Sequence, residues 1–296
     1  MIAHAHPIAP IITTRGCPYS CTYCSAPITA GKRMRYRDPK NVVDEIEMLI
    51  NEYGVKEIQI EDDNFTLKRH HATAVCEEII KRKIKIHWSL PNGVRIDKLD
   101  PELLKLMKKS GCYCMALGIE SANQRIQDMT KKHLDINLVR KVVKMVKDSG
   151  IDGVGFFILG FPTETNEEFN QTYKLLSELE VAYLHVFTYS ERDNTLAAEM
   201  ENVVPQKVRA KRSKMLRGLS AKKRRSFYES QMETTRTVLF EGENKEGYIH
   251  GFTENYIKVK TPWNPELVNT LHKVKLTKID EDGLVRFDFV NQPLFA

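Results

Sequence analysis

Short runs of bulky apolar residues alternate with longer amphipathic stretches through the first two thirds of the chain. Six of these runs are typical of buried strands: APIITT, VKEIQIE, KIHWSL, CYCMALGI, GVGFFILG and AYLHVFTY. The stretches between them have helical spacing, and in one of them Asp38 can cap a helix that has Pro39 in its first turn and ends at Gly54. Six such units predict an α/β fold with a parallel sheet, either doubly wound or curled into a partial barrel. In both arrangements functional residues gather at the C-terminal ends of the strands.

The pattern changes near Pro205. Residues 202–228 contain ten Lys or Arg and no Asp or Glu. After Phe240 come four strand-like runs, GYIHGF, ENYIKVKT, LHKVKLTKI and LVRFDFV, which predict a small antiparallel β-barrel of about 55 residues. We therefore expect three parts: an α/β domain at 1–204, a basic helical connector at 205–237 and a small β domain at 238–296.

Composition limits the class of protein. A chain of 296 residues with 42% hydrophobic content can bury a full-sized core, and its net charge of +6 is modest. No apolar stretch approaches the roughly 18 residues of a membrane helix, and the N-terminus lacks a basic region followed by an apolar core. We expect a cytoplasmic monomer that does not bind membranes.

Three of the six cysteines stand close together in RGCPYSCTYC, directly after the first predicted strand, at positions 17, 21 and 24. In a chain of this length they favour metal or redox chemistry over a disulfide framework. A structural zinc site needs four ligands, and no second Cys or His pair follows at a suitable distance. A [4Fe–4S] cube held by three thiolates keeps one iron open for a substrate or cofactor. A zinc or redox-thiol loop remains the alternative.

The spacing CxxxCxxC on this loop resembles that of the radical S-adenosylmethionine (radical SAM) enzymes. The resemblance implies a partial (β/α)6 barrel of that type at 1–204 and two cofactors, a [4Fe–4S] cluster on Cys17, Cys21 and Cys24 and S-adenosylmethionine on the open iron. One electron from the cluster then cleaves the sulfonium to give a 5′-deoxyadenosyl radical, so a reductant such as flavodoxin or ferredoxin is expected.

Further motifs follow the later strands and resemble the cofactor-binding segments of the same enzymes: IEDDNFT, SLPNGVRID, GIESANQRIQDMTKKH and FFILGFPTET. The resemblance implies that Asp62 or Asp63 receives the methionine ammonium and that the Gly160 and Pro162 backbone contacts adenine. Asp63 alone can equally be a helix cap. The cofactor-binding residues implied in this way are Tyr23, Asp62, Asp63, Asn92, Glu120, Ser121, Gly160 and Pro162.

Different parts of the sequence resemble two different subfamilies of these enzymes. Residues 12–180 are most similar to radical enzymes that often follow a cobalamin-binding domain. Residues 183–296, with HVFTYSERDNTLAAEM and GFTENYIKVKTPW, resemble the tRNA methylthiotransferases that act on threonylcarbamoyladenosine next to the anticodon, including their RNA-binding TRAM domain.

Methylthiotransferases also carry an N-terminal domain with a second cluster, and no such sequence precedes Cys17. We therefore expect a chain with one cluster that relies on a partner or is a truncated or recombined form. Cys76, Cys112 and Cys114 are the only spare thiols, and we expect them to be buried structural cysteines, with a second cluster as the alternative.

The basic run predicts phosphate binding, because no acid within it can neutralise its charge. A solvated helix face is the alternative. Phe252, Tyr256 and Trp263 of the predicted barrel offer stacking surfaces, which makes a structured RNA the expected partner. We expect RNA contacts at Lys222, Lys223, Arg224 and Arg225.

The sequence thus predicts a radical SAM enzyme, a transferase that methylthiolates N6-threonylcarbamoyladenosine in tRNA. The first alternative is a cobalamin-associated type of radical enzyme acting on a small molecule, a lipid or a peptide. A non-enzymatic RNA-binding protein with a relict barrel is a third.

Overall fold

The computed structural model describes residues 5–181, 183–184 and 186–293, and the chain divides into two compact units. Unit 1 comprises 1–179 and 186–215, and unit 2 comprises 180–185 and 216–296. The long helix α8 (Gln206–Ser230) begins in unit 1 and ends in unit 2, so the border falls inside the connector expected at 205–237.

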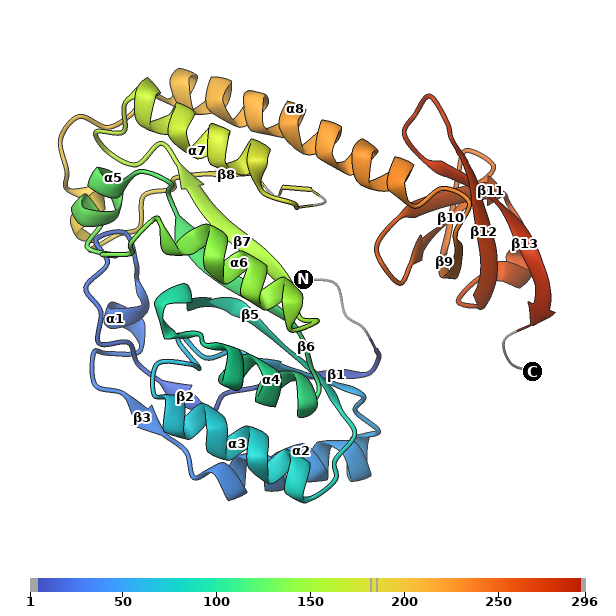
Figure 1. Ribbon diagram of the computed structural model, residues 1–296, viewed down its shortest axis with the longest axis horizontal. Helices are drawn as coiled ribbons and strands as arrows, with labels where there is room; N and C mark the ends of the chain where they lie inside the picture. The colour runs from blue at the N-terminus through green and yellow to red at the C-terminus, as the bar shows by residue number, and fades with distance from the viewer. Residues whose placement is uncertain (1–4, 182, 185, 294–296) are drawn as a thin grey trace. The chain divides into compact units, whose positions relative to one another are not determined.

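Unit 1 is built on a six-stranded parallel sheet that curls into a half-barrel, as predicted (Figure 1). All six expected strands are present, and every neighbouring pair is parallel. The last strand has two residues, and positions 182 and 185 of its expected run lie outside the described residues. In spatial order the strands are β1 (Ile8–Ile11), β4 (Glu57–Ile60), β5 (His87–Arg95), β6 (Cys112–Glu120), β7 (Asp152–Leu159) and β8 (Phe187–Thr188).

Helices cover the outer face of this sheet (Figure 1). Helix α2 shows why they form where the sequence predicts. Asp38 caps it by accepting the Lys40 N–H at 2.8 Å, Pro39 is its first residue, and Gly54 ends it in the left-handed conformation. The helices of unit 1 before α8 are α1 (Ala26–Thr29), α2 (Pro39–Tyr53), α3 (Arg69–Lys81), α4 (Pro101–Lys109), α5 (Gln124–Met129), α6 (Leu138–Asp148) and α7 (Asn166–Glu178).

A two-stranded ribbon lies beside the sheet and was not predicted. It pairs β2 (Thr14–Arg15) antiparallel with β3 (Arg35–Tyr36). Two residues per strand are too few to produce an alternating hydrophobic pattern, so the sequence gives no signal for it.

Unit 2 contains a closed barrel in the order β10–β11–β13–β12–β9. The strands are β9 (Thr235–Lys245), β10 (Tyr248–Thr253), β11 (Lys258–Pro262), β12 (Leu271–Ile279) and β13 (Val285–Pro293). Val238, Phe240, Ile249, Val259 and Val274 fill its core. Two features differ from the expectation: β9 starts within the expected connector, and β11 pairs with β13 in parallel.

Short 3₁₀ turns complete the described elements at Ile96–Lys98, Leu196–Ala198 and Pro265–Leu267. Among the described helices, none has the length and apolarity that a membrane span requires.

Candidate active site

The three clustered cysteines lie on the loop between β2 and α1, close to the C-terminal end of the sheet, and each is half-buried. The Cys17 N–H donates to the Gly31 carbonyl at 3.0 Å, which holds the start of the loop. The Thr22 N–H donates to the Thr130 carbonyl at 2.9 Å, which ties the middle of the loop to the end of α5. The thiols are therefore carried by a loop that is fixed at two points.

Burial raises the pKa of each of the three thiols, and charge repulsion from Cys24 adds to the rise at Cys17 and Cys21. The Lys132 ammonium opposes this rise at all three positions, so it lies within electrostatic reach of the whole set. In the described part of the chain, no three Cys, His, Asp or Glu side chains converge on one point as the ligands of a single ion do. Three free thiols on one loop are the donor set that a four-iron cube with one open iron requires.

Lys132 is a site residue that sequence reasoning missed. It is buried, and its Nζ lies 3.1 Å from Glu120 Oε1. Glu120 ends β6 with a φ of +68°, a conformation that is strained for a glutamate and is found preferentially at functional sites. Lys132 stands in the segment GIESANQRIQDMTKKH that drew attention to Glu120, but only the fold brings the two side chains together.

Tyr23 packs its ring 5.3 Å from the Phe161 ring, and its hydroxyl donates to Glu120. Burial raises the pKa of this hydroxyl, with the Glu120 carboxylate adding to the rise. The structure thus brings together three of the expected positions: the thiol loop, the end of β6 and the loop after β7.

Asp62 and Asp63 are placed differently. The Asp62 carboxylate is buried and accepts four hydrogen bonds, from the backbone N–H and the hydroxyl of both Thr13 and Thr14, at 2.5–3.0 Å. Its acceptor sites are therefore used to fix the start of β2. Asp63 is half-buried, and its charge acts on Cys17 and Cys24. Of the two, Asp63 is the one whose charge acts on the thiols.

Two other expected residues, Asn92 and Ser121, bond to partners elsewhere in unit 1. Arg95, three residues after Asn92, also reaches the thiol loop. The Asn92 amide donates to the Glu61 carbonyl at 2.8 Å, which links the ends of β5 and β4. Ser121 is buried and its hydroxyl lies 3.4 Å from that of Thr172 on α7. Arg95 bonds to Asp97, stacks 4.0 Å from the Tyr19 ring centroid and lowers the pKa of Cys21 through its charge.

The Gly160 loop, residues 160–164, follows β7 and contains Pro162. Gly160 has a φ of +78°, and its N–H donates to Glu164 Oε2 at 2.8 Å. Glu164 also forms a buried ion pair with Arg212 of α8 at 2.6 Å. A Cβ on Gly160 would lie 2.8 Å from Cγ of Arg209, so the first turns of α8 pack directly on this loop.

The basic run is therefore not uniform. Arg209 and Arg212 are buried in unit 1, where they pair with Glu191 and Glu164, acids that lie outside the run. Arg225 pairs with Glu229, one residue beyond its end. Seven of the ten basic side chains are exposed, and this set includes Lys222, Arg224 and Arg225, whereas Lys223 is half-buried.

The three spare cysteines are all buried, Cys76 on α3 and Cys112 and Cys114 on β6. Burial raises the pKa of Cys76 and of Cys114 to about 12 and also raises that of Cys112. Thiols in such surroundings stay protonated and inert, which agrees with a structural role.

Comparison with known proteins adds to this geometry. The model of the radical SAM superfamily matches residues 11–176. The chain is 36% identical over 177 residues to an uncharacterized methyltransferase of Pyrococcus horikoshii, covering 60% of this chain and 38% of that protein. It is 29% identical over 253 residues to the threonylcarbamoyladenosine tRNA methylthiotransferase MtaB of Aquifex aeolicus, covering 83% of this chain and 60% of that one.

Among solved structures, the fold is similar to that of the radical S-adenosylmethionine methyltransferase TsrM of Kitasatospora setae, with cobalamin and a [4Fe-4S] cluster bound. The TM-score is 0.59 at 20% identity, covering 64% of this chain and 36% of that one. The chain thus spans between about a third and 60% of the length of these proteins.

Proposed function

The chain belongs to the radical SAM superfamily and is an enzyme of that family, and we propose that it modifies tRNA by methylthiolation of N6-threonylcarbamoyladenosine next to the anticodon. Its relatives include both methyltransferases and methylthiotransferases. The proposal selects the second group and assigns RNA as the substrate.

The cofactors are those of the family, a [4Fe–4S] cluster and S-adenosylmethionine. When bound and reduced, they supply a 5′-deoxyadenosyl radical that removes a hydrogen atom from the substrate. In our proposal Cys17, Cys21 and Cys24 hold the cluster, and Asp63 and the Gly160 loop bind S-adenosylmethionine. Tyr23 and the Glu120–Lys132 pair close the site beside the thiols and exclude water from it.

The observation that carries the RNA assignment is the exposed cationic surface of α8. Seven exposed Lys or Arg stand in a stretch that contains no acid, and phosphate groups are the partners that such a surface favours. Four of the exposed or half-buried cations, Lys222, Lys223, Arg224 and Arg225, follow one another directly and belong to unit 2.

The barrel of unit 2 supports the same assignment. Tyr248, His250 and Phe252 alternate with buried residues along β10 and so point outward. Lys258 lies 5.6 Å from the Phe252 ring centroid, and it has no acidic partner among the residues that the structure describes. Lys260 and Arg286, which lie over Tyr248, are neutralised by Asp280 and Asp282. Phe252 and Lys258 therefore form the aromatic and basic pair suited to a nucleotide. Trp263 packs instead against the barrel core.

The second candidate is a cobalamin-associated type of enzyme acting on a small molecule, a lipid or a peptide. The higher identity to the methyltransferase of Pyrococcus horikoshii favours it, although that match covers only 60% of this chain. An RNA substrate offers phosphates to the exposed cations of α8, whereas a small substrate leaves most of these charges without a role.

Filter binding of bulk tRNA over a range of salt concentrations tests the proposal. Replacing Lys222, Lys223, Arg224 and Arg225 with Ala should flatten the slope of log affinity against log salt by up to roughly three units. The reason is that tRNA binding releases fewer counterions when fewer phosphates are contacted. The matched control removes four exposed lysines from the outer helices of unit 1. These are Lys105, Lys109, Lys141 and Lys174.

Mass spectrometry of tRNA nucleosides from cells with and without the protein identifies the product. We expect the 2-methylthio form of N6-threonylcarbamoyladenosine to disappear without it. An unchanged salt slope in the quadruple variant, together with unchanged nucleosides, refutes the proposal and supports a small-molecule substrate.

A further inference from the structure

The β2–β3 ribbon carries a second concentration of positive charge, and this one lies in unit 1. Residues 31–40, GKRMRYRDPK, contain five Lys or Arg and a single acid, Asp38. Asp38 is already used as the cap of α2. The segment follows the thiol loop, and nothing in the proposed chemistry of that loop requires so many cations.

Strand register places two of these charges directly opposite each other. Arg15 on β2 faces Arg35 on β3, and both side chains are exposed. Like charges in this position destabilise a strand pair. One Arg35 N–H group donates to the Ala30 carbonyl, and Arg15 has no partner among the described residues. Arg15 and Arg35 therefore have N–H donors and positive charge that are available to bind an anion.

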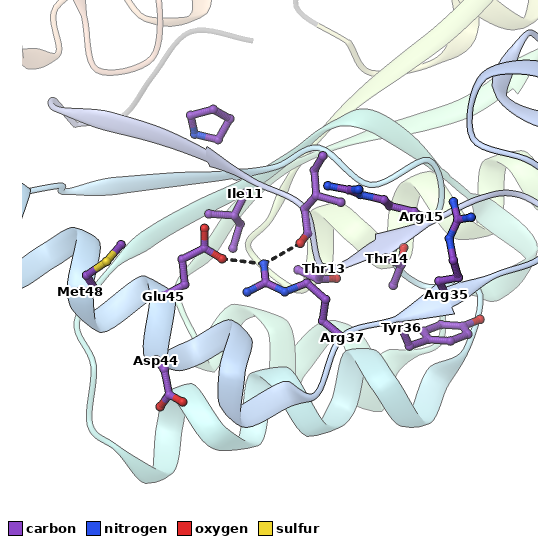
Figure 2. Close-up of a pocket in the computed structure, with 12 residues that line it drawn as sticks. Ile11, Thr13, Thr14, Arg15, Arg35, Tyr36, Arg37, Asp44, Glu45 and Met48 are labelled. Carbon is purple, nitrogen blue, oxygen red and sulfur yellow. Dashed lines mark hydrogen bonds and ion pairs between the residues drawn. The ribbon is translucent and has the colours of Figure 1, made fainter.

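The two arginines stand at one end of a surface hollow of about 920 Å³, formed by β1, β2, β3 and the middle of α2 (Figure 2). Ile12 and Met48, which are 37% and 39% exposed, give the hollow an apolar part. Its size lies in the range of small-molecule and cofactor pockets and is sufficient for a nucleotide.

Acidic side chains at the other end of the hollow do not oppose an anion. Glu45 is paired with Arg37 at 2.5 Å, as Figure 2 shows, and Arg37 also donates to the Ile12 carbonyl. Asp44 is paired with Arg82 at 2.6 Å. After these pairings the excess charge at the hollow is that of Arg15 and Arg35.

The hollow is joined rigidly to the thiol loop through Gly16, which lies between Arg15 and Cys17. Gly16 has a φ of +97°, and a Cβ there would come within 2.5 Å of the Arg33 carbonyl oxygen. Only glycine allows this close approach of two backbone segments. Together with the hydrogen bond from Cys17 N–H to Gly31, it fixes the ribbon to the first cluster ligand.

We infer that this hollow binds a phosphate-bearing nucleotide of the RNA substrate, with the phosphate on Arg15 and Arg35 and the sugar or base against Ile12 and Met48. The inference rests on the proposed function and adds to it a contact in the catalytic unit. Because the site is on the same rigid segment as Cys17, RNA held there is presented to the catalytic loop, in addition to its contacts with α8 and the barrel.

The test is the salt dependence of tRNA binding in an Arg15→Ala/Arg35→Ala variant. Loss of two phosphate contacts lowers the slope by about 1.8, so raising salt from 50 to 200 mM should reduce the affinity of the native protein about 12 times more than that of the variant. Arg15→Lys/Arg35→Lys keeps both charges and should keep the native slope. The matched control, Lys105→Ala/Lys109→Ala, removes two exposed charges from α4 of the same unit and should also keep it.

Several results would overturn the inference. One is an unchanged slope in the alanine variant, and another is an equal loss of slope in the lysine variant, which would show that charge is not the cause. Calorimetry with pyrophosphate separates the sources of phosphate: if the alanine variant loses pyrophosphate binding but keeps the tRNA slope, the hollow serves a free phosphate compound and not RNA. The α8 quadruple variant, measured in parallel, shows whether the proposed function fails together with the inference or stands without it.

Discussion

Replacing Arg212 with Ala should destabilise unit 1 far more than the loss of an ordinary surface ion pair. The side chains of Arg212 and Glu164 are only 4% and 1% exposed, and Nη1 lies 2.6 Å from Oε2. Arg212 also donates to the Glu164 carbonyl at 3.0 Å and to the Asn166 side chain at 3.1 Å. Removing it leaves a buried carboxylate without its charge partner, which costs about 3–5 kcal/mol.

The comparison is Arg140→Ala, which breaks the pair between Arg140 on α6 and Glu178 on α7. These side chains are 56% and 40% exposed, so the pair contributes about 0–1 kcal/mol. The two variants lose the same positive charge from the same unit, and they differ in burial.

Urea unfolding followed by tryptophan fluorescence measures the difference. The chain has two tryptophans, Trp88 buried in unit 1 and Trp263 in unit 2, so a Trp263→Phe background reports on unit 1. With an m value of about 3 kcal/mol/M, Arg212→Ala should lower the midpoint by roughly 1–2 M. A loss below about 1 kcal/mol, equal to that of Arg140→Ala, would refute the reasoning.

A second variant isolates the charge from the lost packing. Glu164→Gln added to Arg212→Ala keeps an acceptor for the Gly160 N–H but removes the unpaired charge, so the double variant should be more stable than the single one.

The effect of pH on the stability of the native protein has a definite sign at Glu164. Burial raises the pKa of Glu164, so its folded form binds a proton more tightly than the unfolded chain, and stability rises as pH falls through the window above 4.5. Without Arg212 the pKa of Glu164 rises further, so stability depends on pH up to higher values. In the Glu164→Gln variant this pH dependence is absent because the side chain does not titrate.

Other expected outcomes follow from the site. Replacing the three cysteines of the CxxxCxxC loop with Ala should abolish iron binding, which in anaerobically reconstituted native protein should be about four irons per chain; iron retained by the triple variant contradicts the cluster assignment. Asp63→Ala should weaken S-adenosylmethionine binding, measured by equilibrium dialysis, with an unchanged cluster spectrum, whereas Asp62→Ala should mainly lower the melting temperature because four hydrogen bonds lose their acceptor. Arg125→Gln should make stability less dependent on acid pH. The bond from Arg125 lowers the pKa of Glu168, so the ionised carboxylate stabilises the fold above pH 4.5. This stabilisation, about 1 kcal/mol because the arginine is half-exposed, is lost as pH falls through the folded pKa of Glu168. Identical acid unfolding curves for native and variant protein would contradict this.

The elements that sequence reasoning predicted are those whose signal is local. Six apolar runs gave the parallel sheet, and Asp38, Pro39 and Gly54 gave the ends of α2, because capping and periodicity act within a few residues. The two-residue strands β2 and β3 were missed because they are stabilised by their pairing and not by their own pattern.

In the site, the three cysteines stood out by spacing, whereas Lys132, Arg209 and Arg212 did not. Each of these cations is buried against an acid that lies 12 to 48 positions away along the chain. From composition alone, every lysine and arginine of the basic run is expected to be exposed to solvent. Which lysines and arginines of the run are buried depends on acids that only the fold brings near. In the same way, only the fold shows that Asp62 bonds to Thr13 whereas the charge of Asp63 acts on Cys17.

The closed ring of β9 to β13 bears on how such chains are assembled in evolution. Every strand of the ring has a neighbour on both sides, so the module offers no free edge on which a foreign strand can add. A part without edges can be transferred from one gene to another with little risk of mispairing in its new host. This property gives a physical reason why one catalytic sheet can occur with different attachments.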